Sequence, residues 1–114
     1  MAFRMLNSGW ARIWLVEVGR MPNGVRDILA RQRYELEVDG ELAFIDYRRT
    51  GGIVTMTYAE VPPPLRGGGV GSMLVKGALA LVRERGEKVI PRCSFVAHYM
   101  RRHPEVHDLL APGR

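Results

Sequence analysis

At the centre of the chain stands the sequence Val61-Pro62-Pro63-Pro64-Leu65-Arg66-Gly67-Gly68-Gly69-Val70-Gly71-Ser72. It joins a segment rich in β-branched residues to an apolar segment with helical spacing, so we expect a strand, a glycine-rich turn and a helix in this order. Glycines let several backbone N–H groups point into one concavity, and the N-terminus of the helix adds partial positive charge. The sequence therefore predicts a cradle for a phosphate or diphosphate group.

The two commonest phosphate-binding loops do not fit this sequence. A nucleoside triphosphatase loop ends in Gly-Lys-Ser/Thr, whereas Gly71 is followed by Ser72 and Met73. The dinucleotide-binding pattern requires a third glycine, and Ser72 stands at that position. The spacing that fits is Arg-x-x-Gly-x-Gly, formed by Arg66, Gly69 and Gly71.

In this loop the chain resembles the GNAT N-acetyltransferase superfamily, whose acetyl-CoA diphosphate motif has the same spacing. The similarity extends roughly from Arg33 to Leu110. Together its segments are similar to the short, single-domain Yjdj-like branch. The segments outside the loop are Tyr58-Ala59-Glu60-Val61-Pro62, Val89-Ile90-Pro91-Arg92-Cys93-Ser94-Phe95-Val96 and Arg101-Arg102-His103-Pro104-Glu105.

The resemblance implies a fold, a coenzyme and an activity. It implies a GNAT-like α/β domain of the α+β type, acetyl-CoA at the glycine loop, and transfer of the acetyl group to an amine. Three positions depart from the pattern: a basic residue or Gln is usual where Gly68 stands, Thr where Ala59 stands, and Pro is common where Ser94 stands. None removes the predicted cradle, although the missing basic residue would weaken coenzyme binding.

The segment before the loop predicts an antiparallel meander of three strands. Arg33 to Val38 alternates between charged and apolar residues, which is typical of a strand. Asp39-Gly40 is typical of a tight hairpin turn. Glu41 to Arg49 is then the return strand, and Ile53 to Val61 is the third strand.

The segment after the loop predicts a helix from Val70 to Arg85 that stops at Gly86. Arginines near its end favour the C-terminal dipole. Its expected apolar stripe is Val70, Met73, Leu74, Gly77, Ala78, Leu81 and Val82.

A right-handed crossover makes the next strand, Lys88 to Cys93, a parallel neighbour of the third strand. Pro91 breaks the hydrogen bonding within it, so we expect this strand to splay and to open a cleft beside the loop. Helices are predicted at Ser94 to Arg102 and at Pro104 to Leu110.

Composition limits the domain count and the compartment. The 114 residues suffice for one domain, and one cysteine allows no internal disulfide framework, so a reducing cytoplasm is expected. No apolar run approaches the ~20 residues that span a bilayer. The net charge of +5 suits an anionic coenzyme at least as well as nucleic acid. Nucleic-acid binding ranks last, because aromatic residues are not interleaved with the arginines.

We assign the domain to residues 21–114 and expect residues 1–20 to lie outside it. The latter contain an apolar run between Trp10 and Val18 with no evident strand or helix partner. The first interpretation is an artefact of start-site choice, with translation beginning at Met21. A structural extension, as an added strand or interface segment, comes second, and a targeting peptide last.

The coenzyme is expected to contact the loop chiefly through backbone N–H groups, with the Ser72 hydroxyl as a further donor. An ordinary strand-to-helix turn is the alternative, but three consecutive glycines carry a backbone-entropy cost that a simple turn does not require. The predicted coenzyme-binding residues are Val61, Arg66, Gly67, Gly68, Gly69, Val70, Gly71, Ser72 and Cys93.

Three residues are candidates for catalysis. Glu60 ends the strand beside the cleft, where it would accept the proton of an incoming ammonium; it would equally be an exposed carboxylate. Cys93 follows a parallel strand, which places it near the expected thioester. It would be a wall of the cleft, an acceptor of the acetyl group, or a small buried residue without a role in the reaction. The resemblance suggests Tyr99 as the donor of a proton to the leaving thiolate, although it would otherwise pack in the core.

No metal site is expected, because His98, His103 and His107 lack evident partner ligands. The leading hypothesis is direct acetyl transfer from acetyl-CoA to an amine in a ternary complex. The alternative is a CoA-binding sensor or interaction module without turnover. The acceptor and the oligomeric state are not predicted.

Overall fold

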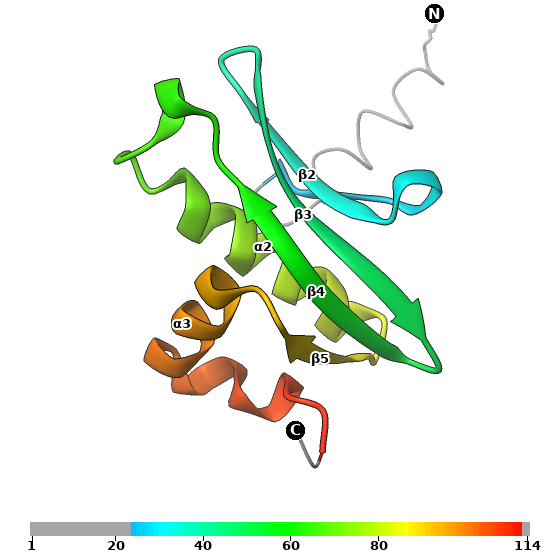
Figure 1. The fold of residues 1–114 in the computed structure, drawn as a ribbon. Helices are drawn as coiled ribbons and strands as arrows, with labels where there is room; N and C mark the ends of the chain where they lie inside the picture. Colours follow the sequence, from blue (N-terminus) through cyan, green and yellow to red (C-terminus); the bar gives the residue numbers. More distant parts are fainter. Residues whose placement is uncertain (1–23, 113–114) are drawn as a thin grey trace, which may run out of the picture.

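The computed structural model describes residues 24–112, which form one five-stranded sheet with flanking helices (Figure 1). The expectations for residues 1–20 lie outside the described residues. The elements are β1 (Arg26–Ile28), the 3-10 turn η2 (Leu29–Arg31), β2 (Arg33–Val38), β3 (Glu41–Thr50), β4 (Ile53–Glu60), η3 (Pro63–Leu65), α2 (Val70–Glu84), β5 (Lys88–Pro91), α3 (Ser94–Arg102) and η4 (Pro104–Leu109).

The sheet has the order β1-β2-β3-β4-β5. β1 to β4 pair antiparallel and β4 pairs with β5 in parallel, which confirms the predicted mixed sheet of an α+β fold. The prediction missed β1, whose three residues show no apolar alternation. It also made the second C-terminal segment a helix to Leu110, whereas η4 is a 3-10 helix that ends at Leu109.

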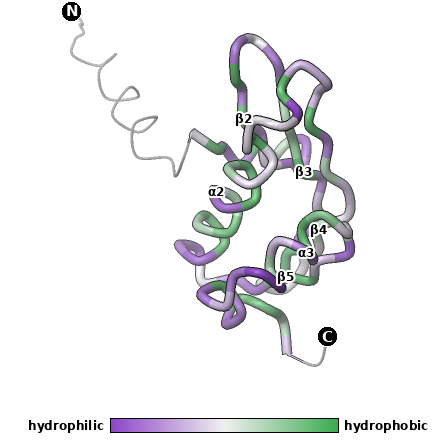
Figure 2. The backbone as a smooth tube through the Cα atoms, turned by 90° about the vertical axis from the view of Figure 1, so that its left-hand side faces the viewer, coloured by the Kyte–Doolittle hydropathy of each residue, from purple (hydrophilic) through white to green (hydrophobic). Residues whose placement is uncertain are grey.

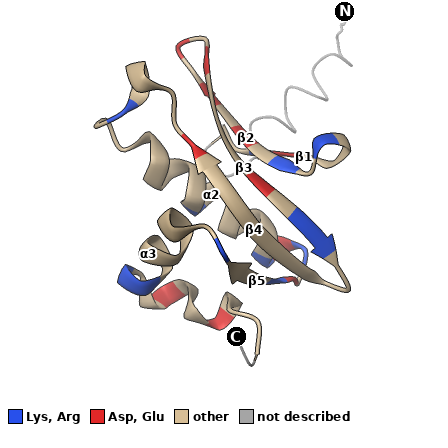
Figure 3. Cartoon of the chain, in the orientation of Figure 1, with Lys and Arg blue, Asp and Glu red and all other residues tan. Residues whose placement is uncertain are grey.

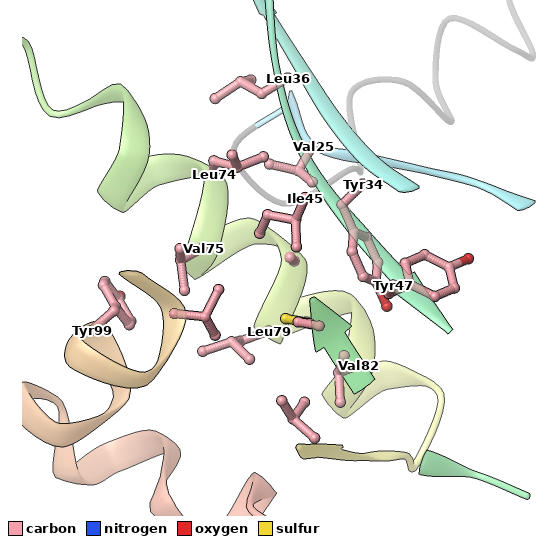
Figure 4. Close-up of a cluster of buried hydrophobic side chains, with 14 of the residues drawn as sticks. Val25, Tyr34, Leu36, Ile45, Tyr47, Leu74, Val75, Leu79, Val82 and Tyr99 are labelled. Atoms are coloured by element: carbon pink, nitrogen blue, oxygen red, sulfur yellow. The ribbon is translucent and has the colours of Figure 1, made fainter. Parts of the chain in front are cut away.

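The core lies between α2 and one face of the sheet (Figures 2 and 4). The predicted helical stripe was partly wrong, because Met73 is 41% exposed while Val75 and Leu79 are buried. The reason is that α2 contacts α3 and η4 as well as the sheet, so its buried side is wider than one stripe. No helix of the described residues lies over the opposite face of β2, β3 and β4 in the view of Figure 1.

The pairing of β4 with β5 ends at Met56 and Pro91. Backbone N–H groups of Arg92 and Cys93 both donate to the Met56 carbonyl oxygen, at 2.9 Å each, and the chain then enters α3. Pairing is lost where Pro91 predicted it, but the strand stops there instead of continuing to Cys93. Residues 57–60 of β4 therefore have no β5 partner along one edge.

A polar network ties the opposite end of the sheet together. The Arg49 guanidinium bonds the Glu87 carboxylate at 2.7 and 3.2 Å, the Asp27 carboxylate at 2.9 Å and the Tyr47 hydroxyl at 2.9 Å. Tyr47 in turn donates to Asp27, and its ring lies 4.8 Å from that of Tyr34. Only 12% of the Asp27 side chain and 9% of the Glu87 side chain are exposed, so both acids need a cation partner. Arg49 supplies it to both at 2.7 to 2.9 Å, and Arg85 adds a longer contact of 3.5 Å to Glu87.

We expect the free energy of unfolding to fall at alkaline pH. Burial, followed by the hydrogen bond to Asp27, raises the pKa of Tyr47 to about 12, and burial also raises the pKa of Tyr34. Both phenols would lose protons near pH ~10 in the unfolded chain but keep them in the folded one. Deprotonation therefore favours unfolding as pH rises from ~10 to ~12.

Urea unfolding at pH ~9 and pH ~11 checks this prediction. The free energy of unfolding should fall less between pH ~9 and pH ~11 in the Tyr47→Phe variant than in the parent protein. This holds whatever the stability of the variant at pH ~9. An equally steep decrease in a Tyr34→Phe/Tyr47→Phe double variant would show that other groups cause it.

Candidate functional site

A cleft of about 550 Å³ lies where β4 has lost its partner. Its walls come from the end of β4, the glycine-rich loop, the first turn of α2 and one side chain of α3. The lining residues are Tyr58, Ala59, Glu60, Val61, Leu65, Arg66, Gly67, Gly69, Val70, Gly71, Ser72, Leu74 and Phe95. The cleft thus brings together most of the predicted coenzyme-binding residues, with Glu60 beside them.

The loop positions backbone N–H groups for an anion. Gly67 and Gly69 have φ angles of 84° and 83°, whereas Gly68 between them does not have a left-handed φ. Alternating backbone conformations of this kind turn successive N–H groups toward one side, as in known anion-binding nests. Glycine adopts these positive φ values without the steric cost that a Cβ atom brings.

The first turn of α2 supplies further donors. Gly69 is its N-cap, no side chain caps the helix, and the first turn contains no acidic residue. The backbone N–H groups of Val70, Gly71 and Ser72 therefore have neither an intrahelical nor a side-chain acceptor. Three such donors at the positive end of a 15-residue helix fit a diphosphate group.

Arg66 closes the base of the loop. Its Nε donates to the carbonyl oxygen of Val61 at 2.9 Å, across the 3-10 turn η3. The side chain is otherwise exposed at the rim of the cleft. It therefore places positive charge beside the glycine turn. Figure 3 shows a basic (blue) segment in the connection between β4 and α2.

Gly71 allows α3 to approach α2. A Cβ atom at this position would lie 2.7 Å from Cζ of Phe95, which is closer than real side chains come. Phe95 is 41% exposed and its ring forms a wall of the cleft. The prediction missed Phe95 as a site residue, because its place in the cleft depends on how α3 packs against α2.

A β-bulge decides which way Glu60 points. Asp46 pairs with Tyr58 and Tyr47 pairs with Met56, so Thr57 is an extra residue in β4. The bulge moves Tyr58 and Glu60 off the core side that Met56 occupies. The sequence left the orientation of Glu60 open, and a bulge without glycine or proline gives no local signal.

Glu60 and Tyr58 form a hydrogen-bonded pair in the cleft. The Tyr58 hydroxyl donates to Oε1 of Glu60 at 2.7 Å, and this bond raises the pKa of Tyr58. The Glu60 side chain is half-buried, and within residues 24–112 no cation lies within 4.0 Å of its carboxylate. The prediction named Glu60 but missed Tyr58.

Cys93 and Tyr99 do not line the cleft. Cys93 is the half-buried N-cap of α3 and packs against the core. Tyr99 is 7% exposed, stacks on His103 at 3.8 Å between ring centroids, and lines a smaller cavity of about 250 Å³ that shares Ser72 and Phe95 with the cleft. Burial raises the pKa of Tyr99, so its hydroxyl keeps its proton at neutral pH.

The histidines close the C-terminal end of α3. Ring nitrogens of His103 and His107 lie 2.7 Å from the carbonyl oxygens of Tyr99 and Met100. In the part of the chain that the structure describes, no group of three His, Cys, Asp or Glu side chains is arranged to hold a metal ion. Among the same residues, no helix has the length and apolar character needed to cross a bilayer.

Comparisons with known proteins agree with this arrangement. The family of GCN5-related N-acetyl-transferases matches residues 33–109. The solution structure of a GCN5-like protein from Staphylococcus aureus superposes with a TM-score of 0.60 at 26% sequence identity, covering 76% of this chain and 86% of that one. No functionally curated protein matches the sequence.

Proposed function

Because the chain belongs to the GCN5-related N-acetyltransferase family, we propose that it binds acetyl-CoA in the cleft and transfers the acetyl group directly to an amine. One observation carries this proposal: a loop and helix end suited to a diphosphate adjoin the unpaired edge of β4 in one cleft. An anion site alone would suit many ligands. A strand edge beside it suits a ligand that has both a diphosphate and an extended amide-containing arm.

The chain's residues would hold the coenzyme at two places. Backbone N–H groups from Gly67 to Ser72 would bind the diphosphate, helped by the charge of Arg66. Free N–H groups on the edge of residues 57–60 would orient the arm and polarise its carbonyl. When bound, acetyl-CoA supplies a thioester whose carbonyl carbon accepts the amine nitrogen and whose C–S bond breaks.

Glu60 is the proposed base. An ammonium ion has no lone pair, so it must lose a proton before its nitrogen can form the new C–N bond. The Glu60 carboxylate would take that proton, directly or through water, while the Tyr58 hydroxyl holds the carboxylate in place. Tyr99 would protonate the leaving sulfur. Its raised pKa suits this role, because the hydroxyl keeps its proton until it is needed. Tyr99 lines the smaller neighbouring cavity beyond Phe95, so the sulfur would have to reach that side of the cleft.

A second candidate is a CoA-binding sensor or interaction module without turnover. One observation favours it: in residues 24–112 the segment after α3 forms η4 and a single bridge from Leu110 to Val89 of β5. No hairpin therefore walls the acceptor side of the cleft within the described residues. Such an open site would hold an acceptor less firmly than an enclosed one.

Thiol release distinguishes the two candidates. Purified protein with acetyl-CoA is assayed over small alkylamines, a peptide with a free N-terminus and a lysine-containing peptide. We expect turnover that falls ~10²-fold in Glu60→Gln, because the base is lost. Cys93→Ala should keep at least ~10% of it, since direct attack needs no acetylated enzyme.

Two results would contradict direct acetyl transfer. Coenzyme binding without thiol release for any amine would favour the sensor. An acetylated Cys93 in the parent protein, together with an inactive but coenzyme-binding Cys93→Ala variant, would replace direct attack by covalent catalysis.

A further inference from the structure

One face of the sheet lacks a covering layer among the described residues. Along β3, buried residues alternate with half-buried ones from Leu42 to Tyr47, and α2 packs only on the buried side (Figure 1). The other side, the open face, carries Leu42 and Phe44 of β3 and Tyr58 of β4. The ring centroids of Phe44 and Tyr58 lie 6.1 Å apart, and Tyr58 is 51% exposed. An aromatic surface therefore adjoins the cleft, which Tyr58 also lines.

Two carboxylates at the cleft end of the open face have no ion-pair partner among residues 24–112. Glu37 of β2 is exposed, and Glu60 of β4 bonds only the Tyr58 hydroxyl. The other acids of this face, Glu35 and Asp46, are each paired with an arginine. A basic segment of chain would therefore find two charge partners beside the aromatic surface.

The chain itself contains a segment of matching chemistry. Residues 1–20 hold an apolar run between Trp10 and Val18, together with three arginines against one glutamate. Removing apolar side chains from water is the dominant favourable term in folding, and attraction between opposite charges adds to it. The segment thus complements the open face both in apolar character and in charge.

This segment joins the sheet within reach of the open face. Arg26, Glu35, Phe44 and Glu60 lie in one row across β1, β2, β3 and β4. Neighbouring strands are ~4.8 Å apart, so this row is about 14 Å long. An extended chain from Trp14 to Arg26 would span up to roughly 40 Å. The apolar run is therefore long enough to cross the open face as far as the cleft.

We propose that residues 10–18 dock on the open face of the same molecule, with apolar side chains on Phe44 and Tyr58 and the arginines of residues 1–20 near Glu37 and Glu60. Of the three interpretations of residues 1–20, docking corresponds to the structural extension. Tyr58 and Glu60 also line the cleft, so the docked segment supplies a wall on the acceptor side, where the described residues have no hairpin. Docking goes beyond acetyl transfer and does not depend on it.

Tryptophan fluorescence tests the proposal, because Trp10 and Trp14 are the two tryptophans of the chain. The full chain is measured without coenzyme, first in buffer and then in urea that unfolds it. We expect emission at a shorter wavelength and weaker quenching by acrylamide in buffer than in urea. Phe44→Thr should lower the ratio of docked to open molecules about tenfold, since an aromatic contact and its buried area are lost.

Met73→Gln is the matched control for the aromatic variant. Met73 is a partly exposed apolar residue like Tyr58, at 41%, but it belongs to α2 on the other side of the sheet. Its replacement should leave quenching unchanged. Glu37→Lys tests charge without removing an apolar contact, and repulsion should lower the docked-to-open ratio about threefold. This variant also keeps the test valid if Phe44→Thr does not fold.

Three results would overturn the proposal. The first is quenching in buffer equal to that in urea, and the second is equal quenching in the parent protein, Phe44→Thr and Glu37→Lys. The third is emission that changes with protein concentration, since the segment would then cover a second copy of the chain. Neither CoA binding nor thiol release enters these measurements, so failure of the proposed function would leave their outcome unaffected.

Discussion

Gly71→Glu is expected to abolish CoA binding while the domain stays folded. The new carboxylate would lie among the uncapped N–H groups of Val70 and Ser72, where it would accept their hydrogen bonds and repel a diphosphate. We expect at least ~100-fold weaker binding, which corresponds to ~2.7 kcal/mol. Calorimetric titration with CoA measures the loss.

The same substitution should not damage α2. A residue other than glycine favours a helix by up to ~1 kcal/mol, and an acid near the N-terminus interacts well with the dipole. The Cβ atom would displace the Phe95 ring, but that ring is partly exposed and free to turn outward. Circular dichroism and urea unfolding should therefore give a stability close to that of the parent protein.

Two variants separate the causes of the expected loss. Gly71→Gln keeps the size of the side chain but removes its charge, so it isolates repulsion from blockage. Gly68→Ala is the matched loop control, since its Cβ atom would meet only the Leu65 carbonyl oxygen at an ordinary 3.7 Å. It should leave affinity within about twofold. Unchanged CoA affinity in a folded Gly71→Glu protein would remove the loop from the binding site.

Among the substitutions proposed here, Arg49→Met should lower the free energy of unfolding the most. It leaves the carboxylates of Asp27 and Glu87 without their shared guanidinium, although both side chains are nearly buried. Removing one partner of a buried ion pair typically costs ~3–5 kcal/mol. Because Arg49 itself is 20% exposed, we expect the lower end, about 3 kcal/mol, with a fall in Tm on the order of 15 °C.

Arg83→Met is the control for this prediction. Arg83 bonds Asp108 at 2.8 and 3.0 Å, distances similar to those of Arg49, but about half of each side chain is exposed. Exposed pairs of this kind contribute at most ~1 kcal/mol. Urea unfolding of both variants compares them directly. Equal losses would mean that burial does not make the Arg49 network special.

Local signals were sufficient for most of the fold. Asp39-Gly40 predicted the β2–β3 hairpin, and both residues do adopt the positive φ angles that such a turn requires. The loss of pairing at Pro91 followed from its missing N–H group. β1 gave no such signal, because its three residues become a strand only by pairing with Arg33–Glu35 of β2.

In the candidate site, too, local sequence predicted some residues and long-range packing determined the others. The glycine loop was predicted because its residues are consecutive and their chemistry is local. Tyr58 and Phe95 were missed as site residues because long-range packing places them: Tyr58 faces outward only after the bulge at Thr57, and Phe95 borders the cleft only because α3 returns against Gly71. Cys93 was expected to lie at the thiol end of the coenzyme. In the structure it is the half-buried N-cap of α3. The rate of Cys93 alkylation with and without CoA tests this prediction.

Under the proposed function, the uncapped first turn of α2 would make the stability of the fold depend on the concentration of coenzyme. A side chain of the same protein commonly caps a helix N-terminus, whereas the acceptors proposed here are the phosphates of acetyl-CoA. Ligand that binds only the native state adds RT ln(1 + [L]/Kd) to its stability. Proteases attack opened molecules, so the half-life of this chain would lengthen when CoA is abundant and shorten when it is scarce.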